Sequence, residues 1–214
     1  MISLFYQDQS ILVCEKPAGI LSQPSPDCAV SMLSLLEEQI GGQVFPVHRL
    51  DRGVGGVMVF AQTAGAAGAL SRAVQQGSMI KEYLCIVQGR PEPAEGTFCD
   101  LLFKDSGRNK TFVVHRMRKG VKEASLSYRV LDWAAGCSLV QVRLHTGRTH
   151  QIRVQFSSRG MPLVGDRKYG GPAGEMGLWS YRISFPHPDT GTAMCFLCPP
   201  AGAIWQRFLI KDLS

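Results

Sequence analysis

The chain has 214 residues, of which 45% are hydrophobic and 19% charged, a composition that is typical of a folded domain and excludes an intrinsically disordered one. No apolar run approaches the ~20 residues of a membrane-spanning helix, and the N-terminus lacks the basic and apolar parts of a secretory signal. The net charge of +6 favours an anionic partner. We therefore expect one monomeric, cytoplasmic domain over residues 1–214, without membrane contact.

The first half of the chain predicts three strands and two helices. Short apolar runs bounded by Gly and Pro predict the strands, and apolar residues at helical spacing predict the helices. The strands are expected over residues 11–13, 57–61 and 83–87, and the helices over residues 30–40 and 64–76. Gly41 and Gly77 are expected to end the two helices.

The second half predicts two half-buried strands and one helix. Residues 125–130 and 138–144 alternate apolar with polar side chains. Residues 149–158 predict a helix with Thr149 as its N-cap and Gly160 as its C-cap. Because strands and helices follow one another without a regular βαβ rhythm, we expect an α+β fold with a largely antiparallel mixed sheet and flanking helices.

The positive charge is concentrated in residues 104–122, where seven Lys or Arg accompany one acidic residue. The cations are Lys104, Arg108, Lys110, Arg116, Arg118, Lys119 and Lys122. We interpret the segment as a turn or mobile arm between strands. The segment either binds phosphate groups of a partner or is a solvated loop.

The seven cysteines are an odd number in a chain without an export signal, so we expect buried free thiols. Cys195 and Cys198 form a Cys-x-x-Cys pair, but no second pair lies at zinc spacing and two prolines follow it. His48 and His150 have no second histidine three to five residues away, which favours structural histidines. We expect neither a metal site nor a redox site.

Two segments carry the residues of most chemical interest. Asp51 lies between arginines in a glycine-rich turn, where a guanidinium would lower its pKa and keep it ionised, or where it is merely a surface or turn-capping residue. Arg148 and Arg153 lie about the start of the later helix, where each either holds a carboxylate or faces solvent. Tyr83 lies at the mouth of an apolar strand, where it stacks on a base or is a core residue.

Four motifs resemble, in order and spacing, those of the RluA-like pseudouridine synthases. They are His48-Arg49-Leu50-Asp51, Lys81-Glu82-Tyr83-Leu84, Gly147-Arg148-Thr149-His150-Gln151-Ile152-Arg153 and Gly165-Asp166-Arg167-Lys168-Tyr169-Gly170. The resemblance spans nearly the entire chain. It implies an enzyme that converts uridine in ribosomal or transfer RNA to pseudouridine, with neither metal nor organic cofactor.

The resemblance also implies roles for individual residues. Asp51 would be the catalytic aspartate, Arg148 its ion-pairing partner and Tyr83 the ring packed against uracil. Arg49 would hold the RNA, and Ile152 would line the pocket beneath the base. Substrate-binding cations would come from the basic stretch, namely Lys104, Arg108, Lys110, Arg116 and Arg118.

The chain departs from the family pattern in two ways. Gly53-Val54-Gly55-Gly56 stands where many members have a charged residue followed by Thr-Ser-Gly, so hydroxyl support for the turn is missing. Many members also have an N-terminal RNA-binding domain, whereas we expect the catalytic domain alone here. Two other functions stay open: a non-catalytic RNA-binding or ribosome-assembly factor, and a hydrolase that uses Asp51 and His150.

Overall fold

The computed structural model describes residues 1–208 and 210, which fold into two compact units. The first unit comprises residues 1–81 and 179–200, and the second comprises residues 82–178 with the described part of residues 201–214. The predicted α+β class is confirmed, because the described residues form mostly antiparallel strands and three α-helices. None of the helices formed by these residues is long and apolar enough to cross a membrane.

The sheet of the first unit is built around one strand that is buried on both faces. Its order is β1 (Leu4–Gln7), β2 (Ile11–Lys16), β4 (Gly55–Ala61) and β10 (Leu178–Pro186), with β3 (Phe45–Pro46) beside β4 and β11 (Ala193–Leu197) beside β10. All seven residues of β4 are buried, which explains its continuous apolar sequence. Of these pairs only β4 with β10 is parallel.

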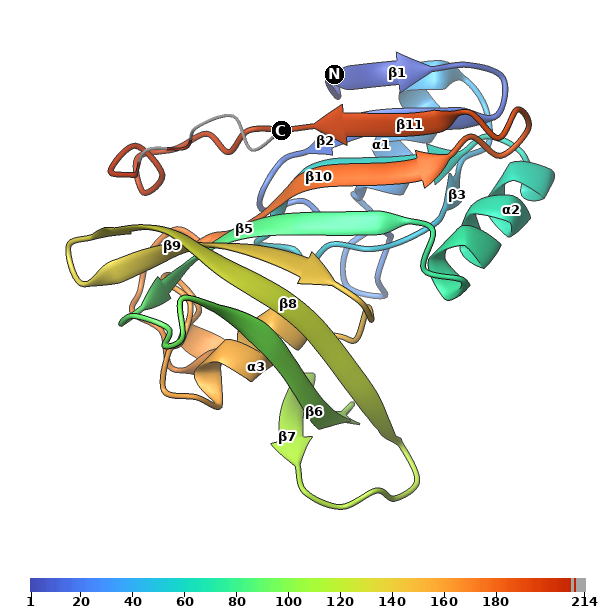
Figure 1. Ribbon diagram of the computed structural model, residues 1–214. Helices are drawn as coiled ribbons and strands as arrows, with labels where there is room; N and C mark the ends of the chain where they lie inside the picture. The colour runs from blue at the N-terminus through green and yellow to red at the C-terminus, as the bar shows by residue number, and fades with distance from the viewer. Residues whose placement is uncertain (209, 211–214) are drawn as a thin grey trace. The chain divides into compact units, whose positions relative to one another are not determined.

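Two helices accompany this sheet, as the sequence predicted. α1 (Met32–Ile40) begins at a Ser31 capping box and ends at Gly41 in the left-handed conformation. α2 (Ala64–Gln75) contacts β4 and β3 (Figure 1). Its C-cap is Gln76, one residue before the predicted Gly77.

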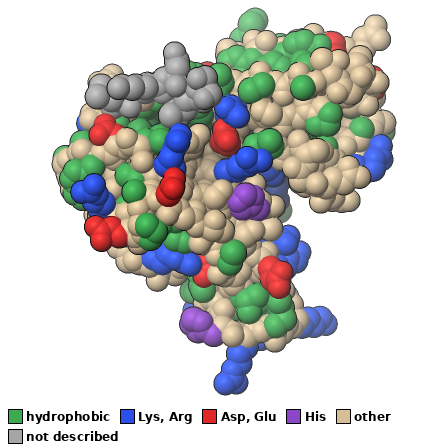
Figure 2. Space-filling model, viewed as in Figure 1, with side chains coloured by type: hydrophobic (Ala, Val, Ile, Leu, Met, Phe, Trp, Pro, Cys, Tyr) green, Lys and Arg blue, Asp and Glu red, His purple; other side chains and the backbone are tan. Residues whose placement is uncertain are grey.

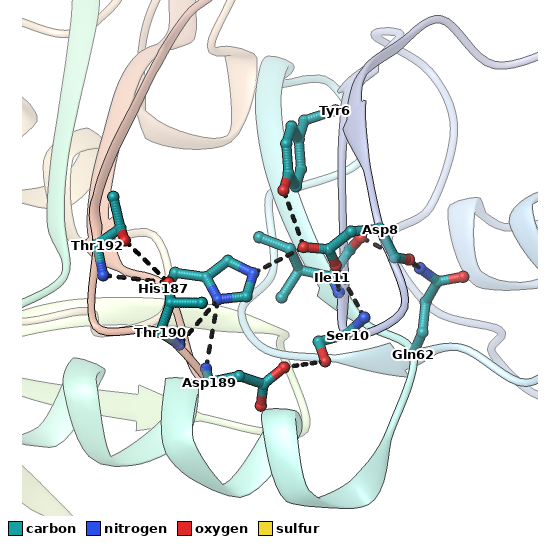
Figure 3. Close-up of polar contacts among 9 residues, drawn as sticks. All are labelled: Tyr6, Asp8, Ser10, Ile11, Gln62, His187, Asp189, Thr190 and Thr192. Atoms are coloured by element: carbon teal, nitrogen blue, oxygen red, sulfur yellow. Dashed lines mark hydrogen bonds and ion pairs between the residues drawn. The ribbon is translucent and has the colours of Figure 1, made fainter.

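A polar network ties the turn before β2 to the turn after β10 (Figure 3). The Asp8 carboxylate accepts hydrogen bonds from Tyr6 Oη at 2.9 Å and from His187 Nε2 at 2.8 Å. Burial alone would raise the pKa of Asp8, but hydrogen bonds from the Ile11 and Ser10 N–H groups, with those of Tyr6 and His187, lower it to about 2. The network therefore holds an ionised carboxylate in place.

The second unit pairs its strands in the order β5 (Ile80–Gln88), β9 (Cys137–Leu144), β8 (Val121–Ala134), β6 (Glu95–Asp105) and β7 (Lys110–Val114). α3 (Gln151–Ser157) packs its Phe156 ring against Phe98 and Tyr128, with centroids 5.1 and 5.8 Å apart. The predicted strands over residues 83–87, 125–130 and 138–144 all lie within these elements.

Three predictions for this unit are wrong in detail. The helix begins at Gln151, and Thr149 is not its N-cap, because Gln151 Oε1 accepts hydrogen bonds from the Arg148 N–H and the Thr146 hydroxyl and holds the preceding residues in a turn. The C-cap is Ser158 rather than Gly160. Residues 104–122 are not a simple turn or arm, since β7 pairs with β6 within them.

The cysteines are free, but only some are buried. Cys14, Cys85 and Cys198 are buried, whereas Cys99 and Cys195 are exposed. The prediction of free thiols is therefore confirmed and that of general burial is wrong. Cys195 lies on β11, whose alternating pattern turns every second side chain to solvent.

Candidate active site

Asp51 lies in a turn that the surrounding backbone holds tightly. Its carbonyl oxygen accepts a hydrogen bond from the Val54 N–H at 3.0 Å. The preceding residue, Leu50, is buried and both of its backbone groups bond to the Ser22 hydroxyl, at 3.0 and 2.8 Å. The Asp51 side chain itself is half-buried. The turn thus presents a partly accessible carboxylate from a fixed backbone.

A fully buried lysine supports the same turn from β2. Lys16 Nζ donates to the carbonyl oxygens of Pro17, Arg52 and Val54, at 3.0, 3.2 and 2.6 Å. Burial lowers the pKa of Lys16 to about 8, against the opposing influence of the Asp51 charge. Lys16 therefore brings a buried amino group, protonated at neutral pH, close enough to Asp51 to interact with its charge.

Two side chains close to Asp51 in the sequence, those of Arg49 and His48, have different environments. Arg49 is exposed, as an RNA-holding residue requires. His48 Nε2 accepts the Val59 N–H at 3.2 Å. Burial, together with the nearby Lys81 charge, lowers the pKa of His48 to about 3, so the ring is neutral at physiological pH. His48 is thus bound to the backbone through Nε2, as predicted for a structural histidine, but its buried Nδ1 has no hydrogen-bond partner among the described residues.

In the second unit, the predicted residues about α3 differ in exposure. Arg148 is exposed, and its Nε donates to the Glu123 carbonyl oxygen at 2.9 Å. Ile152 is buried on the first turn of α3. Tyr83 is buried on β5, among the buried residues of that strand. His150 lies at the N-cap with φ of 54° and pairs its Nδ1 with Tyr169 Oη at 2.9 Å.

Arg153 makes a buried bidentate ion pair that the sequence reasoning did not foresee. Its Nε and Nη2 donate to the two carboxylate oxygens of Asp166 at 2.7 and 2.8 Å. Both side chains are buried, with exposures of 8% and 1%. Such a fork fixes the plane of the guanidinium. The sequence offered one signal for the role of Asp166, namely its place after Gly165 in the fourth of the family motifs.

The predicted RNA-binding cations lie on and around the β6–β7 hairpin. Lys104, Arg108, Arg116 and Arg118 are exposed, and Lys110 is half-buried. Arg118 lies over the Phe103 ring, with 5.0 Å between its Cζ and the ring centroid. Figure 2 shows Lys and Arg side chains spread over this end of the β6–β8 strands. The basic stretch therefore forms a positive surface on strands β6 and β7 and on the turns that follow each of them.

The predicted site residues are divided between the units. Asp51 and Arg49 belong to the first, whereas Tyr83, Arg148, Ile152 and the basic hairpin belong to the second. The ion pair between Asp51 and Arg148 stays a prediction. Lys16, Asp166 and Tyr169 were not predicted as functional residues.

Comparison with known proteins gives a consistent result. Residues 10–158 match the model of the family described as RNA pseudouridylate synthase. A protein of Aquifex aeolicus (strain VF5), named as an uncharacterized RNA pseudouridine synthase, is 37% identical over 91% of this chain and 68% of its own. The dual-specificity RNA pseudouridine synthase RluA of Escherichia coli (strain K12) is 34% identical, and the match covers 92% of each chain. The structure of human RNA pseudouridylate synthase domain containing 1 shares the fold, with a TM-score of 0.77 and 24% identity over 94% of this chain and 84% of that one.

The chain therefore belongs to the RNA pseudouridylate synthase family. Within that family it is RluA-like, as its motifs indicated, and it is an isomerase of the RNA pseudouridine synthase class.

Proposed function

We propose that this enzyme isomerises particular uridines in structured ribosomal or transfer RNA, with Asp51 as the catalytic carboxylate. The observation that carries the proposal is the support of the Asp51 turn: Ser22 and Lys16 fix the backbone on either side of it, while the Asp51 side chain stays only half-buried. A reacting group needs this combination of fixed position and access to substrate.

The chemistry explains why a carboxylate is needed. When the bond between the ribose and the uracil nitrogen breaks, the sugar becomes electron-poor, as in glycoside hydrolysis. Asp51 either attacks the anomeric carbon or removes a ribose proton. The detached uracil rotates and rejoins the sugar through carbon 5, which then loses its proton to solvent. We assign Tyr83 the role of packing against the base, and Ile152 that of lining its pocket.

Two arginines are candidates for the guanidinium that pairs with Asp51. The family resemblance favours Arg148, which is exposed and close to the start of α3. Arg153 is a second candidate, because its buried fork is already oriented by Asp166 and a fixed cation needs less reorganisation to stabilise a catalytic carboxylate. Arg148→Lys and Arg153→Lys keep the charge but remove the fork. Because Arg153→Lys also breaks the fork to Asp166, the melting temperature is measured beside kcat. The partner of Asp51 is the arginine whose Lys variant loses kcat without a matching loss of stability.

Binding of the RNA is assigned to the basic hairpin and to Arg49. Each neutralised phosphate contributes roughly −0.7 to the slope of log affinity against log salt for single-stranded RNA. Replacing Arg116 and Arg118 by Gln should therefore weaken binding and flatten this slope by about 1.4. Arg90→Gln, at an exposed site outside the hairpin, should leave the slope unchanged.

The decisive experiment measures tritium release from RNA labelled at uracil carbon 5. Ribosomal and transfer RNA transcripts are tested separately with the wild type and with Asp51→Asn. The wild type should release tritium from at least one of them, and Asp51→Asn should release none while still binding RNA. Asp27→Asn, at an exposed site of the same unit, is the matched control. An active Asp51→Asn enzyme contradicts the assignment of Asp51.

A further inference from the structure

Tyr169 lies at the centre of the contacts that join α3, the β6–β7 hairpin and the turn after Gly165. It is buried, with 6% of its surface exposed. Its hydroxyl oxygen accepts the Thr111 N–H of β7 at 2.8 Å and pairs with His150 Nδ1 at 2.9 Å. A backbone N–H can only donate, so the phenol proton is available for the histidine nitrogen.

The Tyr169 ring meets two cations, one from each neighbouring element. Arg153 Cζ and Lys110 Nζ each lie 5.1 Å from the ring centroid. Arg153 belongs to α3 and Lys110 begins β7. Both distances are within the range in which a ring face attracts a cation. One aromatic side chain therefore contacts both an arginine of the candidate site and a cation of the RNA-binding hairpin.

The backbone that carries Tyr169 is itself rigid. The carbonyl oxygen of Asp166 accepts hydrogen bonds from the N–H groups of Tyr169 and Gly171, at 3.1 and 2.8 Å. Gly165 has φ of 78°, and a Cβ there would overlap the Glu175 carbonyl group. The turn thus requires glycine at position 165. It places the Asp166 carboxylate and the Tyr169 ring against the same guanidinium, that of Arg153.

Further contacts join the base of the hairpin to this turn and to the segment before α3. The Thr111 hydroxyl donates to the Thr149 carbonyl oxygen, and Lys168 Nζ donates to the Asn109 carbonyl oxygen, both at 2.9 Å. Tyr169 also packs in a small core with Leu102 of β6. A displacement of the hairpin would therefore be transmitted to Tyr169.

We propose that Tyr169 is a positioning residue, whose ring orients the Arg153 guanidinium for the reaction and whose hydroxyl anchors the RNA-binding hairpin at β7. The inference rests on the proposed function, in particular on a place for Arg153 at the active site and on RNA binding by the hairpin. Tyr169 does not touch the reacting atoms in this scheme. It links the binding of RNA to the geometry of the Arg153 guanidinium.

Two substitutions test the role of the Tyr169 ring and the role of its hydroxyl separately. Tyr169→Phe keeps the ring and removes the hydroxyl, so the dissociation constant for RNA should rise about 3- to 10-fold, as expected for one or two hydrogen bonds. Its kcat at saturating RNA should stay within about twofold of the wild type. Tyr169→Leu also removes the ring, and a misplaced catalytic group should lower kcat by about 10- to 100-fold.

Tyr128 supplies the matched controls. It is another buried tyrosine of the same unit, 6% exposed, whose hydroxyl donates to the Pro93 carbonyl oxygen at 3.0 Å. Tyr128→Phe and Tyr128→Leu impose comparable losses of packing and hydrogen bonding away from Arg153. Melting temperature, single-turnover kcat and the dissociation constant for RNA are measured for all four variants.

The inference is supported if Tyr169→Leu loses far more kcat than Tyr128→Leu at a similar melting temperature, and Tyr169→Phe restores it. It is overturned if the Tyr169 variants keep wild-type kcat or lose no more than their Tyr128 counterparts. Failure of Tyr169→Phe to fold would make the residue structural, which also overturns it. An active Asp51→Asn enzyme contradicts the proposed function instead, so the two failures are distinguishable.

Discussion

Replacement of Lys16 by Met tests whether a buried cation holds the Asp51 turn. The substitution nearly preserves side-chain volume but removes all three hydrogen bonds from Nζ to the carbonyls around the turn. Loss of these contacts, one of them fully buried, should destabilise the fold by about 5 kcal/mol. Lowering the pKa of Lys16 from its ordinary 10.5 to about 8 means that burying the charge already costs about 3 kcal/mol, which the variant recovers.

The expected net loss of unfolding free energy is therefore about 2 kcal/mol at pH 7. Urea unfolding measures it, with the exposed Lys119→Met as a control that should change stability by less than about 0.5 kcal/mol. The pH dependence gives a second test. Because the folded-state pKa lies below the unfolded one, wild-type stability should rise from about pH 8 to 10.5, and the variant should lack this rise. A variant as stable as the wild type at pH 7 would refute the reasoning.

Three other changes have definite expected outcomes. Asp8 has its pKa lowered to about 2, so it stabilises the fold above about pH 4 and stops doing so as the pH falls through about 2; the stability deficit of Asp8→Asn in urea unfolding should shrink over that range. The pKa of His48, lowered to about 3, lies below the unfolded value. The unfolding free energy of the wild type should therefore fall as the pH drops from about 6.5 to 3, and that of His48→Gln should fall less over the same range. Equal pH dependence of the two proteins would contradict the low pKa of His48. Gly165→Ala forces a left-handed residue against a carbonyl group and should lose about 2 kcal/mol or more of unfolding free energy in thermal unfolding. Its control is Gly65→Ala, at an exposed position of α2 where a Cβ would meet only ordinary contacts.

The sequence predicted those elements whose signal is local. A continuous apolar run gave β4, and helical periodicity with a following glycine gave α1, because burial and capping act over a few residues. β1 was not predicted, although Leu4, Phe5 and Tyr6 form a short apolar run; in the structure its side chains alternate between half-buried and exposed. The start of α3 was misplaced because the side chain of Gln151, rather than that of Thr149, satisfies the preceding backbone.

The residues of the candidate site likewise differ in whether a local sequence pattern indicates them. Asp51, Arg148 and Tyr83 were proposed as site residues from motifs, which record residue identity and order. Lys16 was not singled out, because a lysine at the end of a short strand is ordinarily exposed. Its burial depends on carbonyl groups contributed by a loop more than thirty residues away. Contacts of that kind cannot be inferred from local pattern.

The support of the Asp51 turn also bears on the non-catalytic alternative. That alternative drew on the missing hydroxyls after Asp51, where Val54 and Gly55 stand before Gly56. In the structure, a Cβ at either glycine would overlap Trp179 or the Ser180 backbone, so these glycines allow β10 to lie close against β4. The Lys16 amino group, the Ser22 hydroxyl and the Gly19 N–H all donate hydrogen bonds to backbone carbonyl oxygens of the turn. Loss of the hydroxyls therefore leaves the carboxylate on a supported backbone, and the departure from the family pattern gives no structural reason to expect an inactive enzyme.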